Sequence, residues 1–192
     1  MRPGGGHTKG ADFERWLAMK LSAWASNGER KDVFWRSPGS GARSRALGQK
    51  SDTSAHGGDI AATHELGREF IQHVNIECKC YTSFNWRHFL IEAKGELWTY
   101  WVKLCADVKN ARQIPLMIVK ENARDPLLIT NIHAVSILFP SRYLAAGHDP
   151  DIDRYMMYTP FVYKLDALFE IPYPMAVGLL STWSRNELAH NR

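Results

Sequence analysis

The chain has 192 residues, of which 45% are hydrophobic and 23% are charged. This composition is typical of one soluble globular domain and excludes a disordered or collagen-like chain. Three cysteines, Cys78, Cys80 and Cys105, are too few for a disulfide framework and lack the Cys-x-x-Cys spacing of a structural zinc site. Apolar runs stay well short of the roughly 18 residues of a membrane span, and no signal-peptide core follows Met1, so we expect a soluble, cytoplasmic protein without a membrane partner.

The net charge of +4 is unevenly distributed along the chain. Residues 1–50 contain ten Lys or Arg and four Asp or Glu, whereas residues 51–192 contain fourteen and sixteen. A basic N-terminal quarter is typical of a surface that binds a polyanion. A solvated helix face followed by a basic tail explains the charge equally well.

The first third of the chain predicts one helix, one strand and a long loop. Residues 1–10 are rich in glycine and predict a flexible basic arm. Asp12 can cap a helix whose apolar residues recur at helical spacing until Asn27-Gly28. Residues 33–37 predict a short strand, and the Gly-, Ser- and Arg-rich residues 38–58 predict a loop.

The pattern of residues 59–192 predicts a mixed sheet with one further helix. Residues 59–63 and 69–81 indicate two strands joined by a hairpin at 65–68, and residues 94–112 indicate a helix. Three more strands are predicted over 114–120, 126–131 and 134–139, whereas 140–192, with five of the nine prolines, predicts ordered but irregular structure. The order through residue 120 is helix, three strands, helix, strand, which predicts an α/β fold with a mixed central sheet flanked by helices.

The predicted strand 69–81 has one apolar face and one polar face. Alternation places Cys78 and Cys80 among apolar residues, which favours small core residues over a metal site. Glu77 and Lys79 share the polar face. An acid and an amine two residues apart on a strand can serve a hydrolytic site, in which the carboxylate holds a hard cation and the ammonium orients water.

The pattern acid-x-Lys is unspecific by itself, because it occurs four times in this chain. Glu77-Cys78-Lys79 is the copy on a convincing strand, and an isolated Asp59 precedes it after two glycines. Asp59 and Glu77 together would provide the two carboxylates that Mg²⁺ commonly takes from a protein. A symmetric hairpin, however, would place Asp59 opposite Val74, about 10 Å from the position it needs.

These residues resemble the PD-(D/E)XK nuclease superfamily and, within it, the archaeal-type Holliday junction resolvases. The resemblance covers roughly residues 11–120. It rests on Glu14 in the first helix, the loop Arg36-Ser37-Pro38-Gly39-Ser40-Gly41, Asp59, and the Glu77-Cys78-Lys79 pair, which occur in the family's order. Glycine precedes Asp59 where the superfamily name has proline, and residues 140–192 have no counterpart in the minimal resolvase.

The resemblance implies a restriction-endonuclease-like core at 11–139, extended by 140–192 within the same domain, that cuts four-way DNA junctions with symmetric nicks. Asp59, Glu77 and the backbone carbonyl of Cys78 would bind Mg²⁺ or Mn²⁺, Lys79 would position the attacking water, and Glu14 would support the metal. Two symmetric cuts imply a homodimer, and no nucleotide cofactor is expected. The residues expected to contact DNA phosphates are Arg36, Ser40, Arg43, Arg45 and Lys50.

Other functions remain compatible with the same residues. One is a restriction-type endonuclease that uses residues 121–192 to read bases, and another is a non-catalytic DNA-binding module with the same fold. A protein-interaction module is less natural because of the basic N-terminal quarter. The cluster Trp98-Tyr100-Trp101 is interpreted as core and interface rather than as a platform for stacked bases.

Overall fold

A computed structural model describes residues 5–37, 56–111, 113–139, 145–146 and 158–190. The N-terminal half contains α1 (Gly5–Ala25), β1 (Phe34–Arg36), β2 (His56–Gly57), β3 (Ile60–Ala62), α2 (Glu65–His73) and β4 (Val74–Tyr81). The rest of the described chain contains α3 (Trp86–Leu90), α4 (Glu96–Ala111), β5 (Ile114–Glu121), β6 (Leu127–Thr130), α5 (Ile132–Ile137), β7 (Ala145–Ala146), β8 (Phe161–Lys164), α6 (Asp166–Phe169) and α7 (Tyr173–His190).

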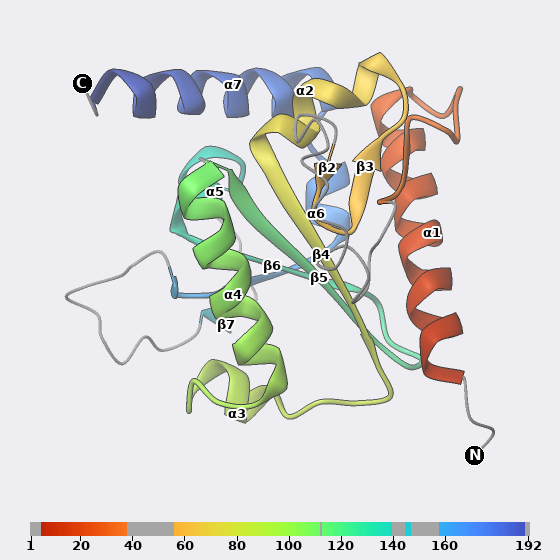
Figure 1. Ribbon diagram of the computed structural model, residues 1–192, viewed down its shortest axis with the longest axis vertical. Coiled ribbons are helices and arrows are strands. Elements are labelled where there is room, and N and C mark those ends of the chain that lie inside the picture. Colours follow the sequence, from red (N-terminus) through yellow and green to blue (C-terminus); the bar gives the residue numbers. More distant parts are fainter. Residues whose placement is uncertain (1–4, 38–55, 112, 140–144, 147–157, 191–192) are drawn as a thin grey trace, which may run out of the picture.

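The described strands form two sheets. A five-stranded sheet has the order β4-β5-β6-β8-β7, in which β4 and β5 are parallel and the other pairs are antiparallel. A smaller sheet, β1-β3-β2, is antiparallel and lies between α1 and the N-terminal part of β4 (Figure 1). The expected α/β class with a mixed sheet flanked by helices is confirmed.

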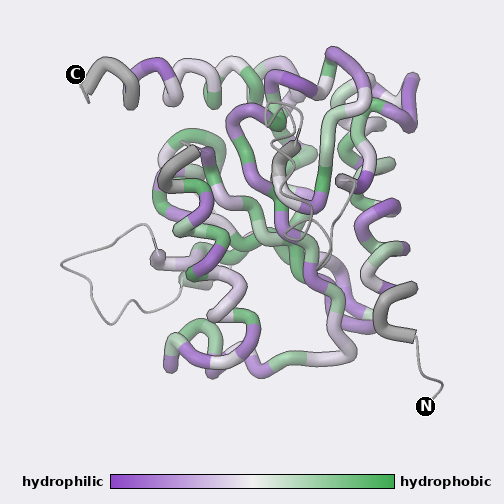
Figure 2. Tube along the Cα trace, in the orientation of Figure 1, coloured by the Kyte–Doolittle hydropathy of each residue, from purple (hydrophilic) through white to green (hydrophobic). Residues whose placement is uncertain are grey.

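The large sheet is covered on both faces, so its second strand, β5, is buried at every position except Lys120. Along β5, Leu116 and Ile118 pack into a core shared with α1, α2, α5 and α7, whereas Met117 and Val119 pack against α3 and α4. In Figure 2, hydrophobic residues are frequent where the strands cross in the middle of the molecule. A strand that is apolar at consecutive positions is typical of a sheet with helices on both faces.

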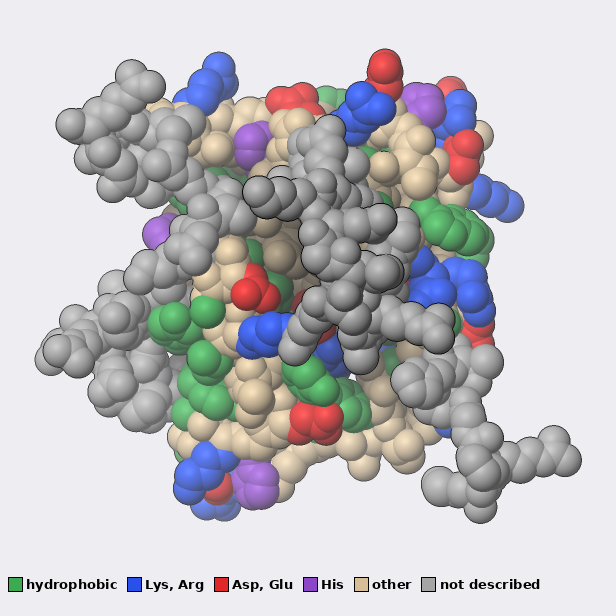
Figure 3. All heavy atoms as spheres, viewed as in Figure 1, with side chains coloured by type: hydrophobic (Ala, Val, Ile, Leu, Met, Phe, Trp, Pro, Cys, Tyr) green, Lys and Arg blue, Asp and Glu red, His purple; other side chains and the backbone are tan. Residues whose placement is uncertain are grey.

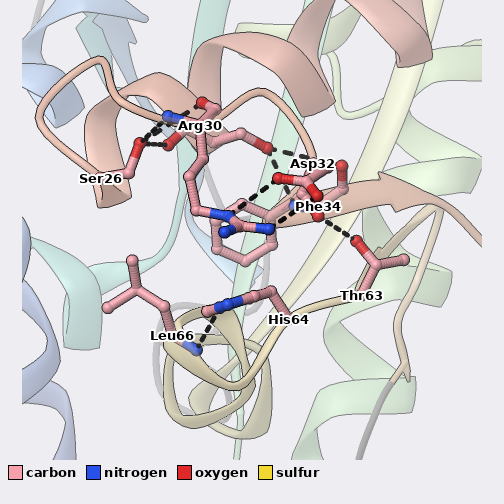
Figure 4. Close-up of polar contacts among 8 residues, drawn as sticks. Ser26, Arg30, Asp32, Phe34, Thr63, His64 and Leu66 are labelled. Carbon is pink, nitrogen blue, oxygen red and sulfur yellow. Dashed lines mark hydrogen bonds and ion pairs between the residues drawn. The ribbon is translucent and has the colours of Figure 1, made fainter.

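The turn between α1 and β1 is fixed by hydrogen bonds of Ser22, in α1, and of Ser26, just after it; Figure 4 shows the contacts of Ser26, Arg30 and Asp32. The Ser22 hydroxyl accepts from the Phe34 amide at 2.9 Å, and the Ser26 hydroxyl accepts from the Arg30 amide at 2.8 Å. The Thr63 hydroxyl donates to the Asp32 carbonyl at 2.6 Å, which joins the end of β3 to the same turn. These bonds hold the small sheet against α1.

Several predicted elements are confirmed, with shifted ends. The first helix begins at Gly5 rather than at Asp12, so residues 5–10 of the segment expected to be a flexible arm are helical. The strands predicted at 33–37, 59–63, 114–120 and 126–131 correspond to β1, β3, β5 and β6, and the helix predicted at 94–112 corresponds to α4.

The hairpin predicted between residues 59 and 81 is wrong. Residues 65–73 form α2, and the strand begins only at Val74. His64 caps this helix, because its Nδ1 accepts from the Leu66 amide at 3.2 Å. Phe70 and Ile71 are both fully buried although they are adjacent, which a helix packed on two sides allows and a simple alternating strand does not.

Two predictions for the second half of the chain are also wrong. Residues 132–137 form α5 rather than a strand over 134–139, and the Asn131 side chain caps this helix by accepting from the Ala134 amide at 3.3 Å. The segment expected to be irregular contains β8 and the long helix α7. Tyr173, Ala176 and Leu180 bury one side of α7 at helical spacing.

Candidate active site

Along β4, buried residues alternate with partly buried polar residues from Val74 to Lys79. Val74, Ile76 and Cys78 belong to the core, whereas Glu77 and Lys79 are only partly buried on the opposite face. This confirms the predicted alternation over 74–79. Burial raises the pKa of the Cys78 thiol well above its usual range, and the nearby acids Asp59, Glu14 and Glu77 raise it further. Cys78 is therefore a protonated core residue.

Asp59 reaches β4 through a parallel pairing at the free edge of the strand. Gly58 forms a parallel bridge with Ile76, and the Asp59 amide donates to the Ile76 carbonyl at 2.7 Å. The Cys78 amide then donates to Asp59 Oδ2 at 2.8 Å. Because α2 carries the chain back before β4 begins, the two segments run parallel and Asp59 lies beside residues 76–78. The distance problem of a hairpin therefore does not arise.

Gly58 allows this close approach. Its φ of +79° lies in the left-handed region, and a Cβ at this position would lie 2.4 Å from the Ile76 carbonyl oxygen and 2.3 Å from Asn75 Oδ1. Any larger residue would push the two segments apart. Glycine before Asp59 is thus required by the packing of the site.

Glu14 and Arg36 approach the site from α1 and β1. Arg36 Nε donates to Glu14 Oε2 at 2.6 Å, and 12% of the Glu14 side chain is exposed. The Ser37 amide donates to the Asp59 carbonyl at 2.9 Å, which ties the end of β1 to the same segment as Asp59. The negative charge of Glu14 contributes to raising the pKa of Asp59.

The electrostatics of the site disfavour a charged Asp59. Burial, followed by the charge of Glu77, raises its pKa to about 7, although the Cys78 amide and Lys79 act in the opposite direction. Lys79 donates to Glu77 Oε1. Burial opposes the charge on Lys79, but Glu77 and Asp59 outweigh it and raise the pKa of the ammonium, so Lys79 is protonated at neutral pH.

The donor set suits a divalent cation held by few protein ligands. No three His, Cys, Asp or Glu side chains of the described residues form a group that could hold a metal ion alone. In the contacts among these residues, Asp59 uses Oδ2 and Glu77 uses Oε1, which leaves the other oxygen of each carboxylate to a cation. Two carboxylates completed by carbonyl or water oxygens are the arrangement that Mg²⁺ takes in many phosphate sites.

The structure brings six of the predicted site residues together. Glu14, Arg36, Asp59, Glu77, Cys78 and Lys79 come from α1, β1, the turn before β3, and β4. The predicted phosphate contacts Ser40, Arg43, Arg45 and Lys50 lie outside the described residues.

Tyr100, which the sequence placed in an aromatic cluster of core and interface, also lies at the site. Lys79 Nζ is 4.0 Å from the centre of its ring. The adjacent Trp101 is fully buried, as predicted for the aromatic cluster, so Tyr100 lies at the margin of the buried stripe of α4. Its position beside the apolar stripe of the helix predicted over 94–112 is the signal that could have identified it.

Comparison with known protein families gives a match over most of the chain. Residues 5–164 match the model of the family described as "Phage putative PDDEXK endonuclease". The chain belongs to this PDDEXK endonuclease family. No curated protein and no solved structure matches the chain.

The four acid-x-Lys pairs differ in where the structure places them. Glu77 and Lys79 lie on β4 beside Asp59. The pair at Glu29 lies in the exposed turn after α1, and the other two lie between α3 and α4 and within α4.

No described helix is long and apolar enough to cross a membrane.

Proposed function

We propose that this PDDEXK endonuclease is a Mg²⁺-dependent enzyme that hydrolyses phosphodiester bonds of DNA at Asp59, Glu77 and Lys79. The observation that carries the proposal is the pair of carboxylates at the edge of β4, where burial and mutual repulsion raise the pKa of Asp59 to about 7. A cation between Asp59 and Glu77 removes this repulsion. The family match adds the reaction class.

Asp59 and Glu77 would hold the metal, together with the carbonyl of Cys78. That carbonyl faces the same edge of β4 as the Cys78 amide, which binds Asp59. A divalent cation at this position supplies Lewis-acid stabilisation of the charge that develops on the phosphate. Manganese fits the same oxygen donors.

The remaining side chains bind and orient the substrate. The Lys79 ammonium, fixed by Glu77, would donate hydrogen bonds to a phosphate oxygen and to the attacking water. Because its pKa is raised, it acts through charge and position and not as a free-amine base. Arg36, held by Glu14, places a second cation near the substrate, and the basic residues of 38–55 supply further phosphate contacts.

The substrate we propose first is a four-way DNA junction, cut symmetrically by a homodimer. The support is the order of the helix glutamate, the Arg36 loop, Asp59 and the Glu-x-Lys pair, which resembles the junction resolvases, and the basic N-terminal quarter. Two equivalent strands cut at one junction require two copies of the site related by a two-fold axis.

One experiment tests reaction and substrate together. The purified protein is incubated with a labelled four-way junction, a linear duplex of the same sequence, or supercoiled plasmid, each with Mg²⁺ or with EDTA. Paired nicks in the junction, only with Mg²⁺, are expected. Discrete plasmid fragments would instead show a restriction-type enzyme, and binding without cleavage of any DNA would overturn the proposal.

A further inference from the structure

The ammonium of Lys79 lies between a carboxylate and an aromatic ring. Glu77 Oε1 accepts from it, and the ring of Tyr100 lies 4.0 Å away, measured from Nζ to the ring centre. Only 18% of the Lys79 side chain is exposed. An aromatic face attracts a cation through its quadrupole, and more strongly where water is excluded. The ring of Tyr100 therefore gives the Lys79 ammonium a second contact in addition to the Glu77 carboxylate.

Tyr100 is itself held firmly on α4. Its hydroxyl donates to Glu96 Oε1, one turn earlier, at 3.2 Å. The next residue, Trp101, is fully buried, and its Nε1 donates to the Tyr158 carbonyl at 2.7 Å. Figure 3 shows acidic, basic and hydrophobic side chains close together over α4, the helix that packs on β5. The ring of Tyr100 is thus presented to β4 from a rigid element.

We propose that Tyr100 is a positioning residue that holds the Lys79 ammonium at the catalytic position through the face of its ring. The inference rests on the proposed function for its effect on cleavage, but the contact itself does not depend on it. A lysine has a long flexible stem, and a displacement of about 1 Å at a reacting centre can cost a hundredfold in rate. Removal of the ring therefore slows the chemical step and leaves DNA binding intact.

Two substitutions separate the ring from the hydroxyl. Tyr100→Leu removes the aromatic face, whereas Tyr100→Phe keeps it and loses the bond to Glu96. In single-turnover cleavage of the labelled junction at saturating protein, we expect Tyr100→Leu to be roughly ten-fold slower and Tyr100→Phe to stay within about three-fold of the unmodified protein. DNA affinity should stay within about two-fold for both. Thr99→Ala, an exposed neighbour on α4, is the control.

Two results of this assay would overturn the proposal. One is an unchanged rate for Tyr100→Leu. The other is an equal loss for Tyr100→Phe, which would assign the effect to the hydroxyl. A double variant decides whether Tyr100 acts through Lys79: in a Lys79→Ala background, Tyr100→Leu should cause no further loss. Additive losses would show that Tyr100 acts through another group.

A measurement without activity keeps this inference separate from the proposed function. The NMR resonance of the Lys79 side-chain methylene next to the ammonium should carry an upfield ring-current shift, with Lys79→Ala providing the assignment. The shift should disappear in Tyr100→Leu and persist in Tyr100→Phe. If the shift is the same in Tyr100→Leu, the positioning contact is refuted. If the unmodified protein cleaves no DNA while the shift behaves as expected, the contact stands and the proposed function fails.

Discussion

Asp59 carries a carboxylate whose charge is opposed by its surroundings. Burial has the largest effect, followed by Glu77, and together they raise its pKa from 3.8 to about 7. Between these two pH values the folded protein retains a proton that the unfolded chain has lost. The contribution of Asp59 to stability therefore falls as the pH rises from about 4 to about 7 and is constant above that.

This linkage predicts a pH dependence that Asp59→Asn removes. In EDTA, the thermal midpoint of the unmodified protein should fall by several degrees between pH 5 and pH 8 relative to that of Asp59→Asn, because the variant has no group to titrate there. Thermal unfolding followed by circular dichroism at unit steps of pH measures the difference. Parallel profiles for the two proteins would show that Asp59 ionises normally.

Lys79 is predicted to act by shape as well as charge. Its raised pKa keeps it protonated, and it fits between Glu77 and the ring of Tyr100. Lys79→Arg keeps the charge but introduces a wide planar group, so single-turnover cleavage should slow about a hundredfold. DNA affinity, measured by fluorescence anisotropy, should change by less than about three-fold. A rate near that of the unmodified protein would contradict this role.

Among the elements, α2 determines how the site is assembled. The sequence predicted a strand over 69–81 because Phe70, Val74, Ile76 and Cys78 fall on one side of an alternating pattern. Phe70 and Val74 are also four residues apart, so a helix fits the first part of the pattern equally well. Local sequence could not choose between the two, whereas tertiary packing of α2 against α7 and β1 does.

The crossing of residues 57–59 with β4 makes Gly58 a critical position. Gly58→Ala adds a methyl group against the Ile76 carbonyl in addition to a strained φ, whereas Gly28→Ala, at a φ of +88° in open space, adds only the strain. We expect Gly28→Ala to cost about 1 kcal/mol and Gly58→Ala about 1 to 3 kcal/mol more. Urea unfolding of the two variants provides the comparison, and equal losses would show that the crossing tolerates a side chain.

The C-terminal elements were the least predictable part of the fold. The apolar run at 134–139 is too short for its period to separate a strand from a helix, and the deciding feature is the Asn131 cap. Helix α7 begins beside Pro172 and Pro174, which sequence analysis took as a sign of irregular structure. Proline fits the first turn of a helix, so these residues mark its start.

At the scale of the whole molecule, the site gathers residues that are far apart in the sequence. Sequence could predict Glu14, Asp59, Glu77 and Lys79 as site residues, because their order along the chain resembles that of a nuclease superfamily. The parallel crossing, the Glu14–Arg36 pair and the Tyr100 contact depend on how α1, the small sheet and α4 pack. No pattern in a single sequence specifies those distances.

The uneven charge of the chain predicts how it binds DNA. If about four to six phosphates are contacted, the logarithm of the binding constant should fall against the logarithm of salt concentration with a slope of roughly −4 to −5. Replacing Arg43 and Arg45 together by alanine should reduce the slope by about 2. Anisotropy titrations over a range of NaCl concentrations measure it. An unchanged slope would mean that Arg43 and Arg45 do not contact phosphates.

The most direct test of the account is cleavage of the labelled junction by the double variant Asp59→Asn, Glu77→Gln. Asp107→Asn is the matched control, because Asp107 is an exposed acid of another acid-x-Lys pair, on α4. With Mg²⁺, the unmodified protein and the control should cut at equal rates, and the double variant should bind the junction within several-fold of normal affinity without producing nicks. Cleavage by the double variant at the rate of the control would contradict the assignment of the active site.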